Sequence, residues 1–184
     1  MITRINLPNL ITIFRIVLIP FFLNFLVYGY TEYALITFLV AGLSDAVDGA
    51  VARFTGTKSE LGAALDPLAD KMLALAAFIA LTILGKIPLW LTLTVVSRDV
   101  IIVTGSAVLY LMGYDLKIRP VIMGKLTTFL QLSLIVAALL CVYLDRDLTV
   151  KEWLVWLTLA FTVASGVQYI IRGFKIVNQE VRGI

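Results

Sequence analysis

Four aspartates lie inside two apolar stretches of this chain, where ionised side chains are costly. The first stretch contains Asp45 and Asp48, and the second contains Asp66 and Asp70. On a helix, residues three or four apart lie on one face, so the members of each pair share a face. If a turn folds the two helices together, the four carboxylates converge and repel unless a cation or protons lie among them. Carboxylate oxygens suit Mg²⁺ or Mn²⁺ rather than zinc or copper, so the pattern predicts a divalent-metal site.

The composition places the chain in a lipid bilayer. It has 184 residues, of which 61% are hydrophobic, and a mean hydropathy of +1.01, which is too apolar for a soluble domain of this length. We expect an all-α polytopic membrane protein with six transmembrane helices, because about six spans of roughly 20 residues fit this length. The predicted spans are 9–28, 33–53, 61–84, 89–112, 121–144 and 153–171, within a single domain over 1–184.

The chemistry is narrowed further by what the sequence lacks. It contains no histidine, which excludes Ser-His-Asp catalysis and zinc sites built on histidine. Acid–base work must therefore fall to carboxylates, lysine or tyrosine. The net charge of only +3 gives no indication of nucleic-acid binding.

Lysine and arginine residues predict the orientation in the membrane. Most of them fall on the side of the N-terminus, the loops after the second and fourth spans, and the C-terminus, whereas the opposite side has Lys86, Arg146 and Lys151. Cytoplasmic loops are enriched in such cations, so both termini should be cytoplasmic. The four aspartates open toward that same face, and the expected location is an inner membrane of bacterial type.

The residues around the aspartates follow the spacing D-x2-D-G-x2-A-R-x8-G-x3-D-x3-D. This spacing resembles the motif of the CDP-alcohol phosphatidyltransferases, integral membrane enzymes of phospholipid synthesis. The resemblance implies that Asp45, Asp48, Asp66 and Asp70 hold two ions of Mg²⁺ or Mn²⁺, and that Asp70 is also the catalytic base. It further implies CDP-diacylglycerol as the donor, CMP as the leaving group and a homodimer.

Four smaller or charged members of the motif are candidates for binding the donor nucleotide. Arg53 is expected to hold the donor's phosphates. Gly49, Ala52 and Gly62 leave room next to the backbone. That room can admit a nucleotide or diphosphate, or it can allow close helix packing, and both interpretations are open.

The first span carries three polar residues on one helical face: Asn9, Thr12 and Arg15. The stretch around them resembles the N-terminal pattern of the family's glycerophospholipid branch. In one interpretation this face points at the nucleotide or diphosphate of the donor. In the other, Arg15 extends its charge among the lipid headgroups.

Cations in and after the fourth span predict an anion pocket for the acceptor. Arg98 lies deep in that span next to Asp99, Lys117 and Arg119 lie in the following loop, and Lys125 opens the fifth span. A phosphate-bearing alcohol is the ligand expected in such a pocket. The alternatives are that Arg98 and Asp99 form an ion pair without a ligand, and that Lys117 and Arg119 contact headgroups.

Two positions bear on the identity of the acceptor. The pattern is similar to the branch that holds phosphatidylglycerophosphate synthases and CDP-diacylglycerol-dependent cardiolipin synthases. The former often carry cations where this chain has Ser106 and Thr127. Both departures are closer to the cardiolipin synthases, whereas a compact chain is more typical of the phosphatidylglycerophosphate enzymes. We expect glycerol 3-phosphate as acceptor, with phosphatidylglycerol, and hence cardiolipin synthesis, as the alternative.

A membrane ion or metal transporter is the alternative that is not an enzyme, since acidic residues in spans also mark ion paths. A transporter would more often show an internal repeat and polar groups continuing to the far face. Here the acids cluster toward one face, and the last span has slight polar content, with Gln168 the main exception.

Overall fold

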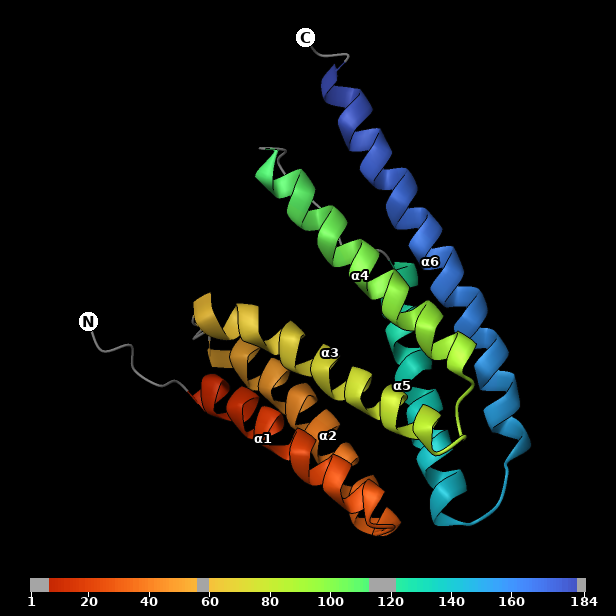
Figure 1. The fold of residues 1–184 in the computed structure, drawn as a ribbon. Coiled ribbons are helices and arrows are strands. Elements are labelled where there is room, and N and C mark those ends of the chain that lie inside the picture. The colour runs from red at the N-terminus through yellow and green to blue at the C-terminus, as the bar shows by residue number, and fades with distance from the viewer. Residues whose placement is uncertain (1–6, 56–59, 113–121, 182–184) are drawn as a thin grey trace. The chain divides into compact units, whose positions relative to one another are not determined.

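The structure is a computed structural model that describes the backbone of residues 7–55, 60–112 and 122–181 (Figure 1). It also describes the side chains in these ranges, apart from those of residues 7–12, 45–55, 60–68, 70, 110, 176 and 178–181. These ranges form six helices: α1 (Leu7–Val27), α2 (Thr31–Thr55), α3 (Glu60–Ile83), α4 (Leu89–Leu111), α5 (Ile122–Tyr143) and α6 (Thr149–Val181). The prediction of an all-α protein is confirmed for the part of the chain that is described.

The helices begin and end close to the predicted bounds, and the last one differs most. The sequence predicts a span over 153–171, whereas α6 begins at Thr149 and continues to Val181. The ten residues that follow Ile171 contain one glycine, Gly173, and no proline. Since proline is the residue that interrupts a helix most strongly, nothing in this segment ends the helix early.

Three helical segments are long and apolar enough to cross a membrane: Leu89–Leu109, Ile122–Tyr143 and Thr149–Lys175. The first three helices contain shorter apolar segments within the described part of the chain. These segments are Ile13–Val27, Thr31–Ser44 and Lys71–Ile83. The chain is thus a helical membrane protein, and the arrangement of six spans stays a prediction.

Three helices end in the same type of turn. The N–H groups of Tyr30, Lys86 and Arg146 donate to carbonyl groups five residues earlier, at 2.8, 2.8 and 3.2 Å. The residues just before them have positive φ angles: Gly29 at 80°, Gly85 at 68° and Asp145 at 49°. These are Schellman caps, which satisfy carbonyl groups that the helix end leaves without partners. They explain why α1, α3 and α5 end where they do.

The chain forms two compact units. Unit 1 comprises residues 1–86 and 138–147, and in it α1 packs against both α2 and α3. Its interior contains aromatic rings and small side chains. Phe22 and Phe38 lie 5.7 Å apart between ring centroids, and Ala41, Ala69 and Ala77 are fully buried. Small residues of this kind let helices approach closely in a membrane, where lipid gives little hydrophobic drive for association.

Unit 2 comprises residues 87–137 and 148–184, and in it α4 lies along α6 (Figure 1). Hydrogen bonds link α5 to α6: the Thr127 hydroxyl lies 3.1 Å from the carbonyl oxygen of Phe161, and the Thr158 hydroxyl lies 3.4 Å from that of Leu130. The interior of this unit is unusually polar for a membrane bundle. Its buried polar side chains are Thr92, Arg98, Thr127, Gln131, Thr158, Thr162 and Ser165. Because polar groups in a lipid environment need internal partners, this interior is where a function beyond packing should be sought.

Candidate functional site

The four aspartates lie on two consecutive helices. Asp45 and Asp48 belong to the C-terminal part of α2, and Asp66 and Asp70 belong to the N-terminal part of α3. The helical backbone at these positions gives each pair the spacing that places both members on one side of a helix. Their side chains lie outside the described part, so their convergence on a cation stays a prediction.

The register of α2 predicts which side of the helix its two aspartates share with the buried residues earlier in the helix. Its buried residues are Ala34, Phe38 and Ala41. Steps of four and three residues continue this stripe through positions 45 and 48. We therefore expect the two acids of α2 to lie on the face along which this helix packs within unit 1.

The same relation holds in α3. Leu73 and Ala77 are buried, and positions 66 and 70 continue their stripe toward the start of the helix in steps of three and four. Among the side chains that the structure describes, no group of three or more acidic, cysteine or histidine residues could hold a metal ion, and the four aspartates are not among those side chains. As donors, four carboxylates have the hard oxygen chemistry that Mg²⁺ and Mn²⁺ require.

Most of the predicted donor-binding residues lie on α1, α2 and α3, but their side chains lie outside the described part. These residues are Asn9, Thr12, Gly49, Ala52, Arg53 and Gly62. Arg15 is the exception, and its side chain is fully buried on α1 within unit 1. In this structure it therefore points into protein rather than outward among headgroups. Its role in holding the donor stays a prediction.

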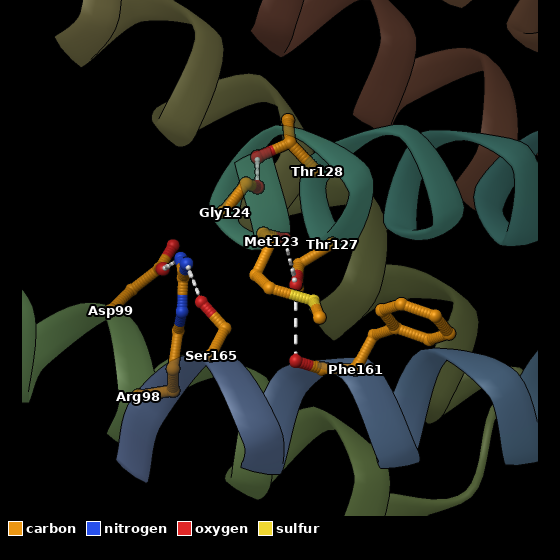
Figure 2. Close-up of polar contacts among 8 residues, drawn as sticks. All are labelled: Arg98, Asp99, Met123, Gly124, Thr127, Thr128, Phe161 and Ser165. Carbon is orange, nitrogen blue, oxygen red and sulfur yellow. Dashed lines mark hydrogen bonds and ion pairs between the residues drawn. The ribbon is translucent and has the colours of Figure 1, made fainter. Parts of the chain in front are cut away.

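Of the two predicted acceptor residues whose side chains the structure describes, Lys125 is exposed and Arg98 is buried in unit 2 (Figure 2 shows Arg98). Its Nη1 lies 2.6 Å from Oδ1 of Asp99, and its Nη2 donates to Oγ of Ser165 at 2.7 Å. Its guanidinium carbon lies 5.8 Å from the ring centroid of Tyr169. The Arg98 side chain is 9% exposed and that of Asp99 28%, so the pair opens toward the surface through the aspartate.

The start of α5 completes the surroundings of Arg98. A Cβ atom added at Gly124 would lie 3.7 Å from Nη2 of Arg98 and 3.5 Å from the hydroxyl of Tyr169. Gly124 therefore brings the first turn of α5 next to a guanidinium group. The N–H groups of a first turn point outward and carry partial positive charge, so this corner of unit 2 favours an anion.

The structure describes one of the other three predicted acceptor residues. Lys125 follows Gly124 on α5 and is exposed. Lys117 and Arg119 lie in 113–121, outside the described residues. The structure thus joins Arg98 and Gly124 in one unit and leaves the grouping of the other cations as a prediction.

Sequence reasoning missed the part that α6 plays around Arg98. The prediction of slight polar content in the last span was wrong, because α6 buries Thr158, Thr162 and Ser165. Their spacing of four and three residues was the available signal, since it marks one helical face. What the spacing could not indicate is that this face meets an arginine 67 residues earlier in the chain.

Comparison with known proteins finds similarity to phosphatidyltransferases of phospholipid synthesis. A family model described as CDP-alcohol phosphatidyltransferase matches residues 5–164. A cardiolipin synthase (CMP-forming) of Rattus norvegicus is 34% identical over 97% of this chain, which spans 64% of that relative. A probable phosphatidylglycerophosphate synthase of Mycobacterium tuberculosis is 35% identical over 92% of this chain and 82% of its own. A CDP-diacylglycerol–glycerol-3-phosphate 3-phosphatidyltransferase of Bacillus subtilis is 34% identical over 92% of this chain and 96% of its own.

Proposed function

Because this chain belongs to the CDP-alcohol phosphatidyltransferase family, we propose that it moves a phosphatidyl group from CDP-diacylglycerol to a glycerol-type alcohol and releases CMP. The observation that supports the proposal is the aspartate motif, whose four positions lie on the helical backbone of α2 and α3. A transporter is not supported, since the family consists of transferases.

The reaction needs a bound diphosphate and a base. Asp45, Asp48 and Asp66 hold two ions of Mg²⁺ or Mn²⁺ together with Asp70, and Arg53 holds the donor's phosphates. When bound, the ions neutralise the diphosphate and make CMP a better leaving group. Asp70 accepts the proton of the acceptor hydroxyl as that oxygen bonds to the phosphorus of the phosphatidyl group and the bond from this phosphorus to CMP breaks.

Glycerol 3-phosphate is the acceptor that we propose first. Its phosphate matches the corner formed by Arg98 and the first turn of α5 at Gly124. Two of the five N–H donors of the guanidinium group serve Asp99 and Ser165, and the buried Nε has no hydrogen-bond partner among the described residues. Donors therefore remain for a phosphate oxygen.

Phosphatidylglycerol is the second candidate acceptor, because this chain has Thr127 at a position that often carries a cation in related enzymes. Where related phosphatidylglycerophosphate synthases often carry a lysine, the Thr127 hydroxyl is buried within hydrogen-bond distance of the carbonyl oxygens of Met123 and Phe161 (Figure 2). This position adds no cation to the corner at Arg98. A less cationic pocket suits a phosphodiester, which carries one negative charge, better than the phosphomonoester of glycerol 3-phosphate.

We propose, further, that the protein works as a homodimer in an inner membrane of bacterial type, with both termini and the aspartates at the cytoplasmic face. The distribution of lysine and arginine supports the orientation. Labelling of single cysteines placed near either terminus, in intact cells and in lysed cells, tests it. Reaction with an impermeant reagent in intact cells would contradict the orientation.

The experiment that tests the function is CMP release by the purified protein. CDP-diacylglycerol is supplied with Mn²⁺ or Mg²⁺ and with either glycerol 3-phosphate or phosphatidylglycerol, and one acceptor should be consumed strongly. Asp70→Asn should abolish release, whereas Asp145→Asn, the same chemical change in an exposed turn, should leave it intact. Full release by Asp70→Asn would remove Asp70 from the mechanism. Use of serine or inositol phosphate instead would contradict both acceptor assignments.

A further inference from the structure

Three residues of α6 surround Arg98 without belonging to the range that the family model matches. That range ends at residue 164, and Ser165, Gly166 and Tyr169 follow it. Ser165 accepts a hydrogen bond from Nη2 of Arg98, and Tyr169 places its ring 5.8 Å from the guanidinium carbon. Gly166 lies beside the stem of Arg98, since an added Cβ would be in ordinary contact with Cγ of Arg98 at 3.5 Å.

These contacts hold a long, flexible side chain in one orientation. An arginine side chain loses rotamer entropy when it is fixed, so an arginine that is fixed in advance binds an anion at lower cost. Asp99 takes Nη1 and Ser165 takes Nη2 on separate helices, α4 and α6. The guanidinium plane is thereby set by two points, and the ring of Tyr169 limits its movement on one side.

The held guanidinium faces the start of α5. Its Nη2 lies 3.7 Å from where a Cβ of Gly124 would be, and the Tyr169 hydroxyl lies 3.5 Å from the same point. Arg98 and Tyr169 thus lie together against the first turn of α5 at Gly124. A phosphate bound there would contact N–H groups of α5 and the remaining donors of Arg98 together.

We propose that Ser165 and Tyr169 are positioning residues, which act through Arg98 to set the affinity of the enzyme for its phosphate-bearing acceptor. The inference rests on the proposed function, because it concerns the acceptor of that reaction. It adds an element of α6 that neither the aspartate motif nor the predicted acceptor residues include.

Steady-state kinetics of Ser165→Ala distinguishes positioning from a general structural role. We expect the KM for the acceptor to rise about 10-fold, since a hydrogen bond to a charged group is worth at least one factor of ten. The KM for CDP-diacylglycerol and kcat at saturating acceptor should change less than about twofold, because Arg98 itself remains. Ser165→Thr retains the hydroxyl and should restore most of the acceptor affinity.

A second pair of variants tests Tyr169 in the same assay. Tyr169→Phe keeps the ring against Arg98 and should raise the acceptor KM only slightly, whereas Tyr169→Leu removes the ring and should raise it several-fold. Thr162→Val is the matched control, since it removes from α6 a buried hydroxyl that has no hydrogen-bond partner among the described residues, and it should leave both KM values unchanged. Thermal unfolding of each variant reports whether it folds, and Tyr169→Phe and Tyr169→Leu carry the test if Ser165→Ala does not fold.

The outcomes separate this inference from the proposed function. If the wild-type protein releases no CMP with glycerol 3-phosphate or phosphatidylglycerol, the proposed function itself is wrong. If the wild type is active and folded Ser165→Ala and Tyr169→Leu keep the acceptor KM, or raise both KM values equally, the inference alone is overturned. A rise confined to the acceptor that Ser165→Thr reverses supports it.

Discussion

Thr127 on α5 and Thr162 on α6 offer a matched pair of substitutions in the interior of unit 2. Both side chains are fully buried. The Thr127 hydroxyl lies 2.8 Å from the carbonyl oxygen of Met123 and 3.1 Å from that of Phe161, whereas the Thr162 hydroxyl has no hydrogen-bond partner among the described residues. Replacement by valine keeps the shape of either side chain and removes the hydroxyl alone. The two replacements should therefore change stability in opposite directions.

The magnitudes follow from the hydrogen bonds. Thr127→Val loses a contact between two helices and should lower the free energy of unfolding by about 1 kcal/mol, because hydrogen bonds between membrane helices are modest in strength. The carbonyl groups of Met123 and Phe161 keep their own helical N–H partners, so the loss leaves no new buried group without a bond. Thr162→Val removes a buried polar group without a partner and should raise the free energy of unfolding by about 1 kcal/mol.

The measurement is the unfolding of both variants in the same detergent, followed by circular dichroism. A difference of about 2 kcal/mol corresponds to midpoints separated by roughly 4–8 °C for a chain of this size. The double variant should lie close to the wild type if the two effects add. Destabilisation of similar size by both substitutions would show that the Thr162 hydroxyl does have a partner, and the reasoning from buried hydroxyls would be refuted.

Three further predictions concern turns, metal and membrane depth. Gly85→Ala should lower the free energy of unfolding by about 1 kcal/mol through the φ of 68° alone, since no atom lies within 4 Å of the added Cβ. Asp145→Gly should raise the free energy of unfolding by about 0.5 kcal/mol, because glycine adopts the positive φ at this position without strain. Unchanged unfolding midpoints would contradict both predictions. Chelation by EDTA should abolish CMP release and Mn²⁺ should restore it, and activity that persists after thorough chelation would exclude the metal site. The tryptophans, including Trp90 and Trp153 near the starts of α4 and α6, should be quenched more by lipids brominated near the headgroup than by lipids brominated at mid-chain. The reverse order would contradict an interfacial position.

Much of the fold was readable from local features of the sequence. Apolar runs of sufficient length predicted the helices, and the turn at Gly85 and Pro88 was predicted from residues that favour turns and helix starts. The aspartate spacing indicated the family, which the family match over residues 5–164 then showed. These features were predictable because helix formation and capping depend on residues within a few positions of one another.

The identity of neighbouring helices was decided only by the tertiary structure. Periodicity indicated that Arg15 had polar neighbours on its own helix face, but not that its side chain is fully buried in unit 1. Arg98 was expected to pair with Asp99, whereas its bond to Ser165 joins residues 67 positions apart. A hydrophobic or polar stripe specifies which side of a helix is inward and not which helix faces it, because many pairings bury the same stripe. The choice among them depends on contacts between helices such as that of Arg98 with Ser165, which exist only once the helices of the unit have packed.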